Sequence, residues 1–144
     1  LIARRAVQVL QLHSVAEDIY AQFRPRLCTM GSTDIPDIFK AYDIRGLVGS
    51  ELTPDFAFAT GVAFARFIIQ EREPGTVVIG EDMRPSSPQL ADAFSAGVTS
   101  LGLDVIRIGL ASTDMLYFAA GKLNMPGAMF TASHNPAEYN GIKL

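Results

Sequence analysis

The residues best suited to chemistry lie close together near the end of this 144-residue sequence. Residues 131–136 have the sequence Thr-Ala-Ser-His-Asn-Pro and follow a short apolar run. That order predicts a strand followed by a loop, with the hydroxyl of Ser133 exposed on the loop. An exposed serine hydroxyl can accept and donate a phosphoryl group, and the small Ala132 leaves room for a phosphate. Lys143 follows ten residues later, where a positive charge can stabilise a phosphoryl group or exchange a proton.

Turn-forming residues surround this serine. Asn135, Pro136, Asn140 and Gly141 are expected to curl the chain around Ser133. The same residue types are also typical of an ordinary polar turn, so residue types alone leave both interpretations open.

A second motif, Gly-Glu-Asp-Met-Arg-Pro-Ser-Ser, occupies residues 80–87. The spacing of Asp82 and Arg84 favours an ion pair or hydrogen-bond framework beneath the site. We expect these two residues to give structural support rather than to take part in the chemistry. The neighbouring acids Glu81 and Asp82 are not by themselves evidence of a metal site.

A third motif covers residues 39–46, a strand-like run closed by a glycine turn, and contains Tyr42 and Arg45. Arg45 is a candidate phosphate ligand, because a guanidinium can bind phosphate through two parallel hydrogen bonds. Other roles remain open for these residues and for His134. Arg45 can pair with Asp43 or Asp82, Tyr42 can be a half-buried core residue, and His134 can hydrogen-bond the turn backbone.

The elements that must position these residues alternate along the chain. Thr53 as N-cap and Pro54 at the first helical position start a helix that runs to about Glu71 and should be largely buried. Apolar residues at helical spacing then predict a helix from Ser86 that ends near Gly102. The remaining predicted elements are a helix over residues 113–124 and strands over residues 76–80, 104–109 and 127–131.

This alternation predicts an α/β fold with three α/β/α layers, in which helices cover both faces of a mixed, mainly parallel sheet. Ligands of such sheets bind beyond the carboxyl ends of the strands. Residues 80–84, 109–113 and 131–136 each follow a predicted strand, so we expect the site among these segments.

Composition excludes several classes of protein. Hydrophobic residues make up 49% of the chain and charged residues 19%, which permits a real core. One cysteine and two histidines argue against an internal disulfide and a zinc site. A net charge of −3 argues against nucleic acid as a partner. The sequence has neither an 18-residue apolar run nor a signal-peptide pattern, so we expect no membrane partner and a cytoplasmic protein.

Organised sequence begins late in the chain. Residues 1–37 are expected to be an extension or linker, with a loose helical pattern over residues 2–23 and two prolines in residues 24–37. Residues 38–144 form the expected domain. Because the chain starts with Leu1 and stops abruptly at Leu144, we expect a fragment truncated at its C-terminus, with Met30 as a possible true start.

Taken together, the three motifs resemble those of the α-D-phosphohexomutases. Residues 131–136 resemble the phosphoserine loop of that family, and Asn-Gly-Ile-Lys at residues 140–143 matches its continuation. Residues 80–87 are similar to the family's Gly-x-Asp-x-Arg-Pro-Ser-Ser segment. Residues 39–46 resemble the opening motif of the phosphomannomutase/phosphoglucomutase branch. The resemblance covers residues 38–144 and implies the N-terminal phosphoserine domain, domain I.

The resemblance implies an intramolecular phosphotransferase that interconverts hexose 6-phosphate and hexose 1-phosphate, of mannose, glucose or both, through a sugar bisphosphate. Ser133 would carry the phosphoryl group, and its phosphate would be a magnesium ligand. Lys143 and His134 would line the phosphoryl group, with Lys143 as the general acid and base. Tyr42 and Arg45 would face the same cleft, and Asn135 would give structural support.

The family's Asp-rich metal loop, sugar-recognition loop and terminal phosphate-binding domain do not occur in this sequence. Magnesium prefers several oxygen ligands in octahedral geometry, which one serine phosphate does not supply. The resemblance therefore implies that Mg²⁺ is bound mainly by another domain. It also implies that the remaining domains of the enzyme are partners of this chain, that a sugar bisphosphate serves as activator, and that the chain alone is inactive.

Other functions remain as alternatives. Phosphoglucosamine mutase usually opens with Gly-Thr-Asp-Gly-Ile-Arg-Gly, whereas residues 40–46 are Lys-Ala-Tyr-Asp-Ile-Arg-Gly. A non-catalytic binding module or a decaying gene fragment can keep the fold, although the presence of Ser133 and Lys143 argues against lost function. A nucleotide-binding oxidoreductase is disfavoured because no Gly-x-Gly-x-x-Gly turn follows a strand, and a serine hydrolase because Ser133 is not in a Gly-x-Ser-x-Gly elbow.

Overall fold

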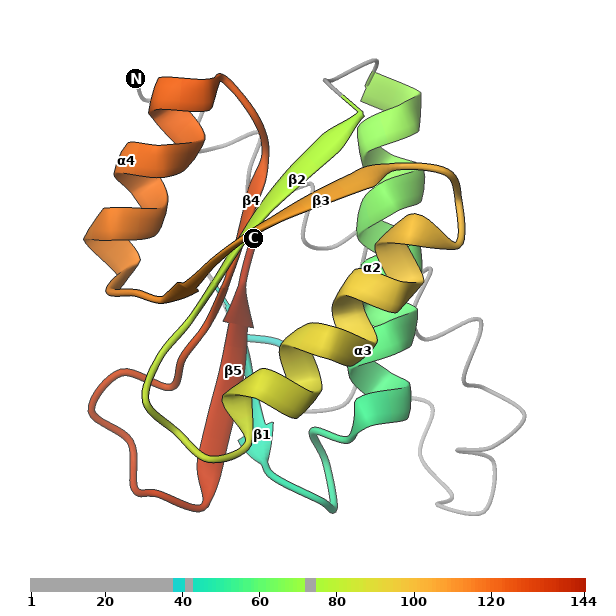
Figure 1. Cartoon of the computed structure of the whole chain (residues 1–144). Helices are drawn as coiled ribbons and strands as arrows, with labels where there is room; N and C mark the ends of the chain where they lie inside the picture. Colours follow the sequence, from blue (N-terminus) through green and yellow to red (C-terminus); the bar gives the residue numbers. More distant parts are fainter. Residues whose placement is uncertain (1–37, 41–42, 72–74) are drawn as a thin grey trace.

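The computed structural model describes residues 38–40, 43–71 and 75–144 (Figure 1). The helix expected over residues 2–23, the linker expected over residues 24–37 and the candidate ligand Tyr42 lie outside these described residues.

The described residues form one sheet of five strands in the order β1-β5-β4-β2-β3. Strand β5 runs antiparallel to β1 and β4, whereas β2 runs parallel to both β3 and β4. The sheet is therefore mixed and mainly parallel, as expected. The strands are β1 (Ile44–Leu47), β2 (Thr76–Glu81), β3 (Asp104–Leu110), β4 (Gly127–Phe130) and β5 (Tyr139–Lys143).

Strand β5 corrects one sequence expectation. Asn140 and Gly141 were expected to form turns around the serine, but they lie within β5 between β1 and β4. Gly141 fits there because the backbone is crowded: a Cβ atom would lie 2.5 Å from the carbonyl oxygen of Ile44 and 2.8 Å from that of Thr131. Pairing with two neighbouring strands therefore overrides the turn preference of these residue types.

The helices cover both faces of the sheet, which confirms the three-layer α/β/α architecture. Helices α2 (Pro54–Glu71) and α3 (Ser87–Thr99) pack on each other against one face. Helix α4 (Thr113–Leu123) packs over β2 and β4 on the other face (Figure 1).

Local signals set the ends of these helices. The hydroxyl of Thr53 accepts a hydrogen bond of 3.1 Å from the N–H of Phe56, as expected for an N-cap. Asn124 ends α4 in the left-handed conformation at φ 53°. Ser86 precedes α3 but makes no capping hydrogen bond with its side chain. Its hydroxyl instead accepts a bond of 2.8 Å from the amide of Asn140, which ties the start of α3 to β5.

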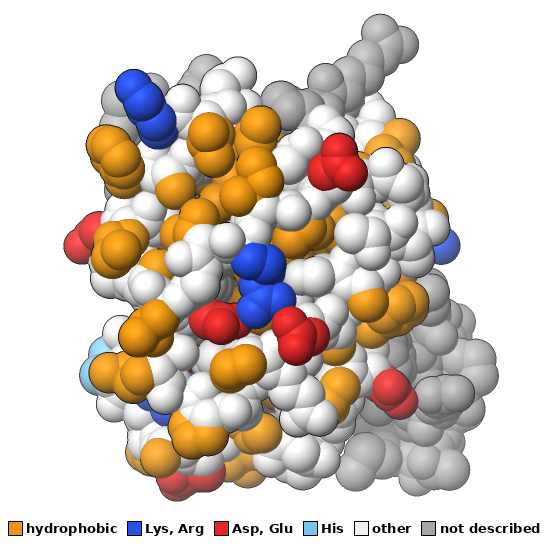
Figure 2. Space-filling model, viewed as in Figure 1, with side chains coloured by type: hydrophobic (Ala, Val, Ile, Leu, Met, Phe, Trp, Pro, Cys, Tyr) orange, Lys and Arg blue, Asp and Glu red, His pale blue; other side chains and the backbone are white. Residues whose placement is uncertain are grey.

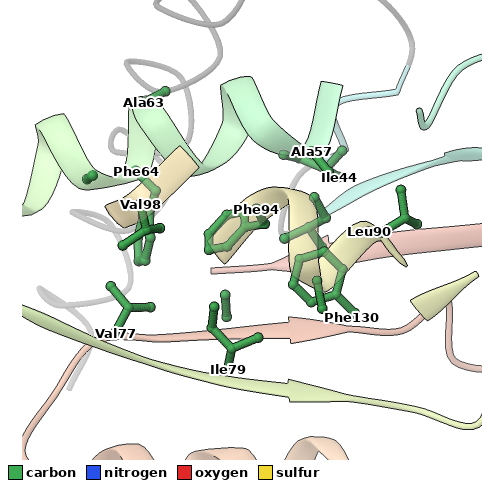
Figure 3. Close-up of a cluster of buried hydrophobic side chains, with 14 of the residues drawn as sticks. Ile44, Ala57, Ala63, Phe64, Val77, Ile79, Leu90, Phe94, Val98 and Phe130 are labelled. Carbon is green, nitrogen blue, oxygen red and sulfur yellow. The ribbon is translucent and has the colours of Figure 1, made fainter. Parts of the chain in front are cut away.

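The main core lies between the sheet and the α2–α3 pair (Figure 3). Phe94 of α3 is fully buried, and its ring packs edge-on against Phe130 of β4 at 5.5 Å and near Phe64 of α2 at 6.0 Å. Figure 3 shows these rings filling the space between the helices and the strands. This packing holds the carboxyl end of β4, and hence the start of the Ser133 loop, against a rigid layer.

Candidate active site

Ser133 lies on the loop between β4 and β5, and its side chain is exposed. Its backbone has a φ of 55°, in the left-handed region that residues other than glycine rarely adopt. The Ser133 N–H donates a hydrogen bond of 3.0 Å to the hydroxyl of Thr131, which supports this conformation. A strained, exposed hydroxyl held by its own loop is typical of a functional position.

His134 follows Ser133 and is also exposed. Its Nδ1 atom lies 3.4 Å from the Ser133 Oγ, so the imidazole contacts the hydroxyl rather than the turn backbone. The ring is therefore placed beside any group that the hydroxyl carries.

Arg45 connects β1 to the same loop. Its guanidinium donates a hydrogen bond of 2.8 Å to the side-chain oxygen of Asn135 and forms an ion pair with Asp43. Asp43 is thus the acid that Arg45 contacts, and Asp82 is not. Through Asn135, the positively charged Arg45 is bonded to the same loop that carries Ser133.

Lys143 lies on the same sheet face as Arg45. Arg45 pairs directly with Gly141 on β5, and Lys143 is two residues further along that strand. Residues paired across strands, or two apart on one strand, share a face. Lys143 also pairs with Met129, which packs beneath α4, so the shared face is the α4 face. The half-buried Lys143 side chain makes no hydrogen bond or ion pair with the residues that the structure describes.

Arg84 follows β2, and its loop lies beside the Ser133 loop at one end of the sheet (Figure 1). The two terminal nitrogens of its guanidinium donate hydrogen bonds to four backbone carbonyl oxygens of the Ser133 loop and the start of β5. The acceptors are Ser133 at 3.0 Å, Asn135 at 2.7 Å, Pro136 at 2.8 Å and Tyr139 at 2.9 Å.

Asp82 lies beneath this arginine. One carboxylate oxygen is 3.3 Å from the Arg84 Nε, and the other accepts bonds from the Arg84 N–H at 3.0 Å and the Ser87 hydroxyl at 2.7 Å. The amide of the fully buried Asn140 donates to the Ser87 hydroxyl at 2.9 Å. A continuous network therefore joins the loop after β2 to β5 under the candidate site.

Sequence reasoning missed some of these groups. The sequence places Thr131 at the end of an expected strand and Asn140 in a turn, without a role for either side chain. In the structure, Thr131 holds the Ser133 backbone and Asn140 joins the buried network. The paired serines of the second motif were a usable signal, since adjacent hydroxyls beside an Asp and an Arg can satisfy a buried amide. The third segment expected near the site, residues 109–113, covers the end of the edge strand β3 and the start of α4, and it makes no hydrogen bond with the Ser133 loop.

The described part of the chain supplies cations but no complete metal site. Arg45 and Arg84 both hydrogen-bond to the Ser133 loop, and Lys143 lies on the sheet face that Arg45 shares. Across the described ranges, no three His, Cys, Asp or Glu side chains come together in a way that would hold a metal ion.

A separate apolar surface lies over α4 and β3. A hollow of about 430 Å³ is lined by Ile108, Asp114, Met115, Phe118 and Ala119, and the Phe118 side chain is 74% exposed. Figure 2 shows hydrophobic side chains gathered in this region. Its lining has no positive group for a phosphate, so it is not an alternative phosphoryl site. No helix in the described ranges is long and apolar enough to cross a membrane.

Comparison with known proteins bears on the family of this chain. Residues 36–144 match the family model described as phosphoglucomutase/phosphomannomutase, alpha/beta/alpha domain I. A protein of Xanthomonas campestris pv. campestris named "Phosphohexose mutases" is 50% identical over 107 residues, which are 74% of this chain and 23% of that protein. The phosphoglucomutase/phosphomannomutase of Thermococcus kodakarensis is 45% identical over 109 residues, 74% of this chain and 24% of that protein.

The fold matches as well. A phosphoglucomutase/phosphomannomutase family protein from Burkholderia thailandensis superposes with a TM-score of 0.67 at 37% identity, over 73% of this chain and 25% of that one. The chain thus spans about a quarter of the length of these relatives. By its sequence and its fold, the chain belongs to the phosphoglucomutase/phosphomannomutase family and contains that family's α/β/α domain I.

Proposed function

We propose that this chain is the phosphoserine domain of an isomerase that interconverts hexose 6-phosphate and hexose 1-phosphate, of mannose, glucose or both. The observation that carries the proposal is the exposed Ser133, held at φ 55° on a loop that Arg45 and Arg84 both bind. The family membership supports a mutase, and the position of this serine supports the way in which the mutase works.

The proposed reaction has two balanced transfers. In the first, a sugar hydroxyl attacks the phosphorus of phosphorylated Ser133, the bond between phosphorus and Ser133 Oγ breaks, and a sugar bisphosphate forms. The sugar hydroxyl loses a proton and the serine oxygen gains one. The bisphosphate then turns around, and Ser133 Oγ attacks its other phosphate. That step restores the phosphoserine and releases the isomeric monophosphate.

The cations around the loop have separate proposed roles. Lys143 exchanges the proton with the serine oxygen, since its side chain has no hydrogen-bond partner among the described residues and lies on the face that Arg45 shares. Arg45 binds phosphate oxygens through its planar fork. His134 lies beside the reacting hydroxyl and stabilises its charge. Tyr42, from the opening motif, is proposed as a substrate ligand on the sequence resemblance alone.

Magnesium, when bound, neutralises charge on the phosphoryl group. From this chain it would take an oxygen of the seryl phosphate. The other ligands, and part of the sugar contacts, are assigned to domains that the longer relatives have and the matched region does not include. We therefore propose that the chain by itself is inactive, and that it works in the cytoplasm with a sugar bisphosphate as activator.

The test uses the full-length enzyme and measures the mass of the Ser133 peptide together with turnover. Ser133 should carry one phosphate, lose it to a sugar monophosphate and regain it from a sugar bisphosphate. Ser133→Ala should lower turnover by at least about a thousandfold, because it removes the nucleophile. A Ser133→Ala enzyme that still interconverts the two monophosphates at an ordinary rate would rule out the phosphoserine mechanism. Ser95→Ala is the control, because this half-buried serine lies on α3 and its hydroxyl donates only to the Ala91 carbonyl of the same helix.

A further inference from the structure

Arg84 has an unusual set of partners. Its two terminal nitrogens carry four N–H bonds, and each nitrogen serves two backbone carbonyls of the segment from Ser133 to Tyr139. These acceptors are neutral, and the charge is balanced from below by Asp82, whose oxygen lies 3.3 Å from the Arg84 Nε. The main role of the guanidinium is therefore to fix the conformation of the loop backbone, in addition to its ion pair with Asp82.

Arg84 bonds directly to the backbone of Ser133. Arg84 donates a hydrogen bond of 3.0 Å to the Ser133 carbonyl, and the Ser133 N–H donates one of 3.0 Å to the Thr131 hydroxyl. Both backbone groups of this strained residue are therefore held. In a trans peptide the N–H points opposite to the C=O. The N–H of His134 therefore faces away from Arg84, and no residue in the described ranges accepts it.

Arg84 also acts on the second contact of the loop. Arg84 donates a hydrogen bond of 2.7 Å to the backbone carbonyl of Asn135. Arg45 donates one of 2.8 Å to the side-chain oxygen of the same residue. The position of Asn135 relative to Arg45 thus depends on the hydrogen bonds from Arg84. Loss of those bonds would release the Ser133 backbone and weaken the Arg45–Asn135 bond at the same time.

We propose that Arg84 is a positioning residue for phosphoryl transfer: it sets the conformation of Ser133 and the direction of the His134 N–H without touching the phosphate. The inference rests on the proposed phosphoserine function. Lysine is not expected to replace Arg84, because an ammonium donates three hydrogen bonds from one point and lacks the planar fork.

The test compares Arg84→Lys and Arg84→Gln with Arg107→Gln in the full-length enzyme. Arg107 is a matched control, since it bridges Glu81 and Asp92 and is half-buried but makes no hydrogen bond with the loop. Arg84→Lys should lower kcat by about 100-fold with KM within about threefold, because a misplacement near 1 Å has such an effect on rate. Arg107→Gln should lower the melting temperature and leave kcat within about twofold.

Two further readouts separate positioning from general stability. A further variant, Arg84→Ala, leaves space for a small cation. Guanidinium ion, at concentrations that leave the enzyme folded, should restore part of the kcat that this variant loses, whereas ammonium ion at equal concentration should not. Should Arg84→Gln fail to fold, Arg84→Lys carries the test, because it keeps a positive charge beside Asp82. A normal kcat in Arg84→Lys, or equal rescue by both ions, overturns the inference. Turnover in Ser133→Ala would instead overturn the proposed function.

Discussion

Arg45 donates a hydrogen bond of 2.8 Å to the side-chain oxygen of Asn135, a residue 90 positions further along the chain. The bond joins β1 to the loop that carries Ser133, although the elements from α2 to β4 separate the two residues along the chain. Because Arg45 also pairs with Asp43, its guanidinium is fixed in direction at both ends of its fork. The opening motif and the serine motif therefore form one unit.

A double-mutant cycle tests this unit in the full-length enzyme. Arg45→Lys should lower kcat/KM by about 10–100-fold, because the ammonium cannot keep Asp43 and Asn135 in the planar geometry of the fork. Asn135→Ala should have a smaller effect of the same kind. The double variant should lose less than the product of the two single losses, since both remove one contact. Losses that simply multiply would show that the two residues act independently.

Replacing Lys143 should affect activity without affecting stability. Its side chain makes no hydrogen bond or ion pair with the described residues, so Lys143→Met should leave the unfolding free energy within about 0.5 kcal/mol. The same change should lower kcat by about 10²–10⁴-fold if the ammonium exchanges the proton with the serine oxygen. Urea denaturation and steady-state kinetics measure the two effects. Lys122→Met, at the end of α4, is the control and should change neither.

The crossing of α2 and α3 depends on two glycines. A Cβ atom on Gly97 would lie 2.1 Å from the carbonyl oxygen of Phe58, and one on Gly61 would lie 2.2 Å from that of Phe94. Gly97→Ala should therefore push the helices apart and destabilise the chain by about 3 kcal/mol or more, as overpacking does. Urea denaturation gives the value.

Gly121 provides the opposite case on α4. It is exposed, and a Cβ atom there would meet no other atom within 4 Å. Gly121→Ala should stabilise the chain by about 0.5–1 kcal/mol, because alanine has the higher helix propensity. If Gly97→Ala were also stabilising, the close crossing of α2 and α3 would be wrong.

The buried side chain of Asn140 should contribute to the stability of the chain. The residue is fully buried and donates to the hydroxyls of Ser86 and Ser87 at 2.8 and 2.9 Å. Asn140→Ala leaves these groups unsatisfied and should destabilise the chain by about 1–3 kcal/mol. Thr99→Ala removes an exposed hydrogen bond of 3.2 Å and should be close to neutral. Equal losses in the two variants would contradict a special role for the buried network.

The helices and most of the strands could be predicted from the sequence alone. Caps such as Thr53 and the helical spacing of Leu90, Phe94 and Val98 are local signals, so the helices start and end close to where they were predicted. The alternation of strands and helices is also readable along the chain, and it predicted the α/β/α layers. The serine, lysine and arginine motifs are single-residue features that need no structure to be seen.

Which of these residues contact one another depends on the folded sheet and could not be predicted from local patterns. Strand β5 was missed because Asn140 and Gly141 have turn-forming side chains, and their strand pairing depends on β1, which lies far away in sequence. The contacts of Arg45 with Asn135 and of Arg84 with the loop carbonyls depend in the same way on strand order. The left-handed Ser133 likewise follows from contacts that hold it, since its own preference opposes that φ. Local patterns reflect a residue and its chain neighbours, whereas these pairings reflect burial and hydrogen bonding among segments that only the folded sheet brings together.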